Sequence, residues 1–253
     1  MAEIEFSTPL EHVALIEVNR PPVNALNRSA RQQLIDLFDS LDQREDLRAA
    51  VLTARGKVFC AGADIKEKGD LSASGGSQSA ANRLTRELFF TLYHSRKPII
   101  GAINGPALGA GMVMACCCDT LIASDSAAFG MPEIDVGQGG GASILQRLVP
   151  RLVMRKMMLT GERVEAAYFH RLGIVDRVVS DDTLISSALE LASVIAAKSP
   201  SAVRAIRQTF AEVEDMSVET AFRMEQRYTS QLSTSPEANE ARAAFFAKRR
   251  PQF

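Results

Sequence analysis

The sequence predicts an α/β core followed by a helical C-terminal region. Apolar runs rich in β-branched residues alternate with segments of helical periodicity up to about residue 179, and only helical patterns follow. Within residues 98–141 a strand, a glycine-rich turn and a helix follow one another directly. The sequence contains no linker that would separate independent domains and no repeat of fixed period. We therefore expect an α/β core over residues 1–180 and a helical region over residues 181–253.

Each expected element is an apolar or amphipathic segment that ends at proline, glycine or a polar cluster. The expected strands are residues 12–18, 49–53, 59–65, 99–103, 121–123 and 175–179. The strand over residues 59–65 is expected to break at Gly62 into an exposed segment. The expected helices are residues 29–41, 81–92, 112–118, 142–148, 155–160, 165–172, 184–195, 203–213, 218–232 and a last one from Pro236. Asn27 or Ser29 can cap the first helix. Residues 69–79 are rich in Ser and Gly without a hydrophobic period, which predicts a surface loop.

The stretch from Pro98 to Gly141 has the strongest functional signal. Its glycines, such as Gly109, permit a sharp turn and close approach of a ligand to the main chain. The helix that follows directs its unpaired N–H groups back at this turn, which is suited to a developing oxyanion. Glu133 lies among Phe129, Met131, Pro132 and Ile134, so we expect desolvation to raise its pKa toward that of a useful general base. In the alternative interpretation the glycines serve close packing alone and Glu133 is a solvated loop acid.

Composition and charge narrow the classes of partner and compartment. The chain has 253 residues and a formal net charge of −1, so nothing in its charge favours nucleic acid or an anionic membrane as the main partner. The N-terminal segment lacks the basic-then-apolar pattern of a secretory signal, and no apolar run approaches the ~20 residues of a membrane-spanning helix. We expect a cytoplasmic protein with no nucleic-acid or membrane partner.

Several common chemical motifs are absent or misplaced. Cys116, Cys117 and Cys118 are consecutive in a helical stretch, so their side chains diverge by about 100° and cannot bind one metal ion together. With Cys60 they are expected to be small buried hydrophobic residues. The three histidines lack zinc spacing, no Walker or G-x-S-x-G motif occurs, and the G-x-G-x-x-A match at residues 137–142 lies too deep in the chain for a dinucleotide site. We expect no metal.

Several stretches, taken together, resemble the crotonase superfamily, the enoyl-CoA hydratase/isomerase group. They occur in the family's order and cover nearly the whole chain. The matching stretches are NRPPVNALN, FCAGADIKE, KPIIGAINGPALGAGMVMACCCD, FGMPEIDVG, QRLVPR, LTGERVEA, LGIVDRVV and FFAKRRPQF. The resemblance implies a spiral of ββα units with a helical C-terminal extension, assembly into homotrimers or hexamers, and an acyl thioester of coenzyme A as substrate. It implies no cofactor beyond the coenzyme A of the substrate.

The resemblance also implies the roles of individual residues. The family's oxyanion hole consists of two backbone N–H groups, and the matching residues here are Ala63 and Ala110. Glu133 matches a catalytic glutamate. The residues that match the family's substrate and CoA contacts are Val23, Ala25, Ala61, Asp64, Ile65, Lys66, Val113 and Pro132.

This chain departs from the family's hydratases at Val113. In those enzymes two glutamates bind the water, and Val113 stands at the position of the second one. The position that is aspartate in the family's dienoyl-CoA isomerases, dehalogenase and hydroxyisobutyryl-CoA hydrolases is Gly141 here. A site with a single carboxylate is the arrangement of 3-enoyl-CoA to 2-enoyl-CoA isomerases, so we expect Glu133 to move a proton along an allyl system.

Two alternatives remain open from the sequence. Hydration is possible if a second acid comes from Asp135, which would share the side of Glu133 in an extended segment, or from Glu67, Asp70 or Glu87. The other alternative is a protein without catalytic activity that binds acyl-CoA or serves as an RNA-binding scaffold. The sequence does not define the acyl group.

Overall fold

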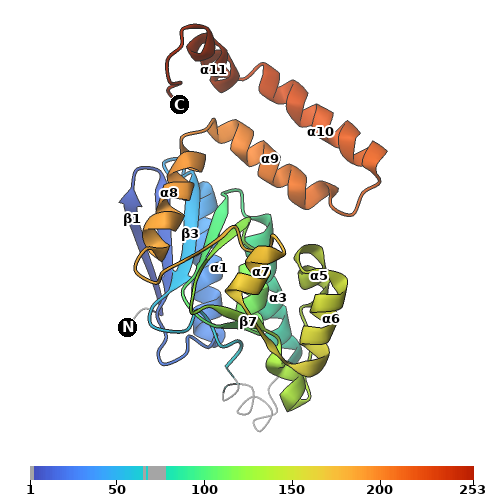
Figure 1. Cartoon of the computed structure of the whole chain (residues 1–253). Helices are drawn as coiled ribbons and strands as arrows, with labels where there is room; N and C mark the ends of the chain where they lie inside the picture. The colour runs from blue at the N-terminus through green and yellow to red at the C-terminus, as the bar shows by residue number, and fades with distance from the viewer. Residues whose placement is uncertain (1–2, 65–66, 68–77) are drawn as a thin grey trace.

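The computed structural model describes residues 3–64, 67 and 78–253 and shows two β-sheets with helices packed on them (Figure 1). The larger sheet has six strands in the order β1-β2-β3-β4-β6-β9, and the smaller has three in the order β5-β7-β8. The strands of the larger sheet are β1 (Ile4–Leu10), β2 (Val13–Val18), β3 (Ala49–Ala54), β4 (Ile99–Ile103), β6 (Thr120–Ser124) and β9 (Arg177–Val179). Those of the smaller sheet are β5 (Ala107–Leu108), β7 (Ala128–Gly130) and β8 (Arg163–Glu165).

The helices follow the expected order closely, and those before β9 are interspersed with the strands. They are α1 (Arg28–Gln43), α3 (Gln78–His94), α4 (Ala110–Cys116), α5 (Ala142–Leu148), α6 (Arg151–Thr160), α7 (Ala166–Arg171), α8 (Leu184–Ala196), α9 (Pro200–Val213), α10 (Val218–Ser233) and α11 (Pro236–Phe246). A short 3-10 helix, η1 (Pro132–Val136), follows β7. Asn27 caps α1, because its side chain accepts a hydrogen bond from the N–H of Ala30 at 2.7 Å.

The central strands of the larger sheet are buried on both faces, as their continuous apolar runs predict. From β2 through β3, β4 and β6 to β9, each neighbouring pair is parallel. Ile16 and Leu52 face one side and belong to an apolar cluster with residues of α1 and α3. Val51 and Ile100 face the other side and cluster with α8. The sheet thus forms the middle layer between α8 on one side and α1 with α3 on the other.

Several local predictions need correction. The sequence patterns did not indicate β1 or the three strands of the smaller sheet, β5, β7 and β8. β1 pairs antiparallel with β2 at the edge of the larger sheet and is mostly exposed, and the other three strands are only two or three residues long. The strand expected over residues 59–65, with a break at Gly62, is present only as two isolated bridges, at Cys60 and Ala63. Gly62 lies between them with φ +104°, a conformation that interrupts an extended strand.

The C-terminal helices α9, α10 and α11 extend away from the two sheets, whereas α8 lies on the larger sheet (Figure 1). Serine side chains cap all three at Ser199, Ser217 and Ser235. These helices leave several phenylalanines largely exposed, namely Phe210, Phe222, Phe245 and Phe246. The homotrimer or hexamer and the domain boundary at residue 180 stay predictions. In the part of the chain that the structure describes, no helix is long and apolar enough to cross a membrane.

Candidate functional site

The helix α4 begins at the glycine-rich turn that the sequence singled out. Gly109 precedes it with φ +53° and ψ −120°, a combination that only glycine adopts without strain. The N–H of Gly109 donates to Gly130 O at 2.9 Å, which fixes the turn to β7. Ala110 is the first residue of α4, so its N–H has no acceptor within the helix. The turn therefore presents the N–H of Ala110 at the end of the helix.

The N–H of Ala63 is directed away from the strand-like segment that Leu26 belongs to. Leu26 donates to Gly62 O at 2.8 Å and accepts from the N–H of Asp64 at 3.1 Å, which makes a parallel bridge between Leu26 and Ala63. In such a bridge the residue between the two bonded neighbours points its own N–H to the opposite side. A side-chain carbon placed on Gly62 would lie 3.6 Å from Ala110 N, so the segment next to Ala63 is in contact with the start of α4.

Glu133 extends from η1 to the same turn. A side-chain carbon placed on Gly109 would lie 2.0 Å from Glu133 Oε1 and 2.8 Å from its Cδ, so the carboxylate rests directly against the main chain of Gly109. The Oε2 atom is buried from solvent. The main chain of η1 is fixed on its C-terminal side, because Gln138 N–H donates to Glu133 O at 2.8 Å. The structure thus brings a carboxylate next to the N-terminal residue of α4.

These groups line one pocket of about 180 Å³. Four of the residues expected at the site lie in its wall, namely Ala63, Ala110, Val113 and Glu133. The other lining residues are Arg31, Glu67, Ala81, Asn82, Thr85, Phe89, Met131, Gln138, Gly139, Gly140 and Gly141. Val113 and Met131 are almost fully buried, so an apolar surface lies beside the carboxylate of Glu133.

Other expected contact residues do not line the described part of this pocket. They are Val23, Ala25, Ala61, Asp64 and Pro132. Ala61 and Val23 are joined, since Ala61 N–H donates to Val23 O at 3.0 Å, and Pro132 begins η1. Ile65 and Lys66 lie outside the described residues.

Gly141 lies against Val113. A side-chain carbon on Gly141 would be 2.6 Å from Val113 Cγ2 and 3.3 Å from Met131 Cε, and the residue has φ +80°. Any side chain at position 141 would therefore need Val113 to move. At the two positions where the resemblance would allow an acid, the structure thus has the side chain of Val113 packed on the backbone of Gly141.

Asp135 does not line the described part of this pocket, which weighs against the alternative in which Asp135 is the second acid. Residues 132–136 form a 3-10 helix and not an extended segment, so side chains two residues apart point in different directions. Asp135 is exposed, and its carboxylate oxygens lie 3.1 and 3.2 Å from a side-chain carbon placed on Gly161. Glu87 is also exposed and does not line the described part of the pocket, whereas Glu67 does. Asp70 lies outside the described residues.

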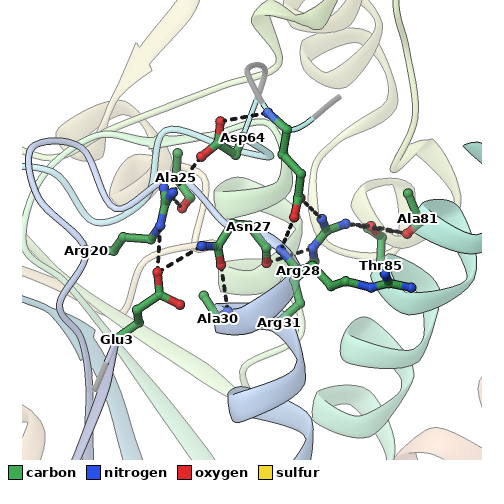
Figure 2. Close-up of polar contacts among 11 residues, drawn as sticks. Glu3, Arg20, Ala25, Asn27, Arg28, Ala30, Arg31, Asp64, Ala81 and Thr85 are labelled. Carbon is green, nitrogen blue, oxygen red and sulfur yellow. Dashed lines mark hydrogen bonds and ion pairs between the residues drawn. The ribbon is translucent and has the colours of Figure 1, made fainter. Parts of the chain in front are cut away.

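A network of hydrogen bonds and ion pairs fixes the segment that carries Ala63 (Figure 2). Arg20 binds Asp64 Oδ2 through Nη2 at 2.7 Å, Glu3 Oε1 through Nε at 2.9 Å and Ala25 O through Nη1 at 2.8 Å. The side chain of Asp64, expected to line the path of CoA, is only 14% exposed. Its carboxylate is thus a link between the segment of Ala63 and the loop that carries Arg20.

Replacing Asp64 with asparagine tests whether this link positions Ala63. We expect the free energy of unfolding to fall by about 1.5–3 kcal/mol, because a hydrogen bond between charged groups is weakened. We also expect kcat to fall while KM for the substrate stays nearly unchanged. Steady-state kinetics checks this split. An increase in KM alone would assign Asp64 to the CoA path instead.

Arg20→Lys should lower kcat and the free energy of unfolding in the same way as Asp64→Asn. The ammonium group of lysine cannot bind three acceptors in one plane as the guanidinium of Arg20 does.

The cysteines behave as structural groups. All four are free thiols, Cys60 and Cys117 are buried, and Cys116 and Cys118 are half-buried. Burial raises the pKa of the Cys60 thiol to about 12, so it is protonated near neutral pH and is a poor nucleophile. Among residues 3–64, 67 and 78–253, no group of three or more His, Cys, Asp or Glu side chains is arranged to hold a metal ion.

A larger cavity of about 340 Å³ lies between α3, α4 and α9. Its charged groups are already engaged, because Arg207 binds Asp119 at 2.9 Å and Glu214 accepts from Tyr93 and pairs with Arg147. We place the candidate site in the smaller pocket, because Glu133 and the start of α4 meet there.

Sequence reasoning missed the polar side chains of α1 and α3 at the pocket, chiefly Arg31 and Thr85. The signal for Arg31 was its position on the apolar stripe of α1, between Ala30 and Leu34, where a charged residue is unusual. Arg31 is only 4% exposed.

Comparison with known proteins places these features in a family. A family model described as "Enoyl-CoA hydratase/isomerase" matches residues 9–253. The chain is 36% identical, over 97% of its length and 99% of the other's, to a Mycobacterium tuberculosis protein named (7aS)-7a-methyl-1,5-dioxo-2,3,5,6,7,7a-hexahydro-1H-indene-carboxyl-CoA hydrolase. It is 33% identical, over 96% and 95% of the two chains, to a 2,3-dehydroadipyl-CoA hydratase from Escherichia coli. The crystal structure of an enoyl-CoA hydratase from Bacillus anthracis superposes with a TM-score of 0.92 at 28% identity, covering 100% and 99% of the two chains.

Proposed function

Since the chain belongs to the enoyl-CoA hydratase/isomerase family, we propose that it is an isomerase that converts 3-enoyl-CoA to 2-enoyl-CoA. The observation that carries this proposal is the position of Glu133, whose carboxylate rests on Gly109 beside Ala110 with Val113 in the same pocket. Valine can neither activate a water molecule nor deliver a proton. The site therefore favours a reaction that needs one carboxylate.

The proposed reaction moves one proton between two carbons. Glu133 removes a proton from C2, between the thioester carbonyl and the double bond, and the electron pair delocalises into a dienolate. The N–H groups of Ala63 and Ala110 donate to the dienolate oxygen, and each donor of this kind is typically worth about 3–4 kcal/mol in the transition state. Glu133 then returns the proton to C4, the double bond shifts to C2–C3, and the thioester carbonyl is restored.

Hydration of a 2-enoyl-CoA is the second candidate, because some relatives are named hydratases and because Glu67 also lines the pocket. Glu67 accepts from Arg31 Nη2 at 2.6 Å and from the N–H of Arg28 at 2.8 Å. A carboxylate that binds a guanidinium and a backbone N–H acts as an acceptor and is a poor proton donor. This arrangement supports isomerisation over hydration.

Offering the two classes of substrate separately distinguishes the two reactions. We expect the purified protein to convert a 3-enoyl-CoA to the 2-enoyl-CoA and to leave a 2-enoyl-CoA unhydrated, as followed by chromatography and mass spectrometry. A gain of one water by the 2-enoyl-CoA at a comparable rate would contradict the isomerase and favour the hydratase. Binding of both thioesters without any turnover would contradict both reactions and favour a protein that only binds acyl-CoA.

A further inference from the structure

One wall of the pocket is polar, whereas a pocket that takes an ordinary fatty-acyl chain is lined mainly by apolar side chains. Its members are Arg31 of α1, Thr85 of α3 and Glu67, which we call the polar wall. Polar groups in a mostly apolar pocket commonly fix the orientation and identity of the ligand. Arg31 and Thr85 of the polar wall belong to α1 and α3, whereas Glu133 belongs to η1.

The polar wall is held by specific contacts (Figure 2). Arg31 donates through Nη1 to Thr85 Oγ1 at 2.7 Å, through Nη2 to Glu67 Oε2 at 2.6 Å and through Nε to Asn27 O at 3.1 Å. The side chain of Arg31 is 5% exposed and that of Glu67 is 25% exposed. Placing an ion pair where it is largely excluded from water costs desolvation energy. A well-packed pair of apolar side chains would stabilise the fold at least as much, so stability alone does not account for the ion pair.

The hydrogen-bonding capacity of the wall favours a donor on the ligand. Most N–H groups of Arg31 are used within the protein, whereas Glu67 accepts two bonds in the contacts described above, from Arg31 and from the N–H of Arg28. An ionised carboxylate has about four acceptor positions. Glu67 therefore has acceptor capacity for a further donor from the pocket.

The charge of the described lining disfavours an anionic ligand group. The described lining contains one cation, Arg31, and two carboxylates, Glu67 and Glu133, so its formal charge is −1. A carboxylate at the end of an acyl chain would meet this negative charge in a partly desolvated place. A neutral hydroxyl can donate to Glu67 without this repulsion.

We propose that the pocket selects acyl-CoA substrates whose acyl group carries a hydroxyl, which donates a hydrogen bond to Glu67 while Arg31 and Thr85 hold that carboxylate in place. This inference rests on the proposed function only in that the pocket takes the acyl group of a CoA thioester. It names Glu67 as a specificity residue and not as an acid or base of the reaction.

The test is direct binding of saturated acyl-CoAs, which lack a double bond and cannot react. Isothermal titration compares a series of ω-hydroxyacyl-CoAs with the acyl-CoAs of the same length in which a methyl group replaces the hydroxyl, and with the ω-carboxyacyl-CoAs. At one or more chain lengths we expect the hydroxyl compound to bind at least about tenfold more tightly than the methyl compound. This is the ratio of dissociation constants that corresponds to one hydrogen bond to a charged group. The carboxylate compound should bind more weakly than either.

Glu67→Gln tests the assignment to this residue. The variant should lose most of the hydroxyl preference and keep the affinity of the native protein for the methyl compound, which also verifies that it is folded. Glu87→Gln, an exposed acid on α3 outside the described lining of the pocket, is the matched control and should keep the preference.

Three outcomes overturn the inference. They are equal binding of hydroxyl and methyl compounds at every length, tighter binding of the carboxylate compounds, and an undiminished preference in Glu67→Gln. Because no turnover is involved, a hydroxyl preference in a protein that fails to shift double bonds would refute the isomerase proposal and leave this inference standing.

Discussion

Replacement of Glu133 with glutamine is expected to lower kcat for the double-bond shift by about 10²- to 10⁴-fold, the usual contribution of a positioned general base. Glutamine keeps the length and most of the shape of the side chain at Gly109, so the affinity for acyl-CoA should change little. The loss should therefore fall on kcat and not on the dissociation constant. Stopped-assay kinetics with a 3-enoyl-CoA and titration with its saturated analogue measure the two quantities.

Asp135→Asn is the matched control for Glu133→Gln. Asp135 belongs to the same 3-10 helix but is exposed and lies by Gly161, outside the described wall of the pocket. Its replacement should leave kcat within about twofold, since surface substitutions of this kind rarely change a structure. Native-like turnover by Glu133→Gln would remove Glu133 from its proposed role. A large loss in Asp135→Asn would show that the effect of replacing an acid of η1 is not specific to Glu133.

Gly109→Ala is expected to have a comparable effect on activity although it removes no functional group. The new methyl carbon would lie 2.0 Å from Glu133 Oε1, so the carboxylate has to leave its position at the start of α4. The backbone at φ +53° is also strained for alanine, which should reduce the free energy of unfolding by about 1–3 kcal/mol. Kinetics and chemical denaturation of the purified variant check both effects.

Gly173→Ala separates strain from displacement of the carboxylate. Gly173 has φ +75°, but a side-chain carbon there would have no atom within 4 Å, and it does not line the described pocket. The free energy of unfolding of this variant should fall by about 1–2 kcal/mol, and its activity should equal that of the native protein. If Gly109→Ala were as active as Gly173→Ala, the contact between Gly109 and Glu133 would not be needed for activity.

The family and fold class were predictable because several motifs occur in order along almost the whole chain. The match over residues 9–253 and the TM-score of 0.92 to a solved enoyl-CoA hydratase confirm both. Strands and helices with strong periodicity, such as β3 and α1, appear where the apolar residues indicated them. The edge strand β1 was missed, because a strand that buries little leaves a weak hydrophobic signal.

The site was predictable only in part, for a physical reason. Motifs indicated Ala63, Ala110, Val113 and Glu133, and the structure brings these four into one pocket. The side on which Asp135 lies depends on local helical geometry, which the short segment after Pro132 does not reveal. The polar wall arises from packing between α1 and α3. The place of Arg31 on the apolar stripe of α1 indicates that it is buried, but neither helix alone shows that Thr85 and Glu67 are its partners.

The most direct test of a single-carboxylate mechanism follows the transferred hydrogen itself. A 3-enoyl-CoA deuterated at C2 is incubated with the protein in ordinary water, and the earliest product is analysed by NMR and mass spectrometry. Because Glu133 Oε2 is buried, we expect part of the deuterium to appear at C4 of the 2-enoyl-CoA, carried there by one carboxylate. Product that contains solvent oxygen at C3, or product without deuterium at C4 even at the earliest times, would contradict the transfer by Glu133 alone.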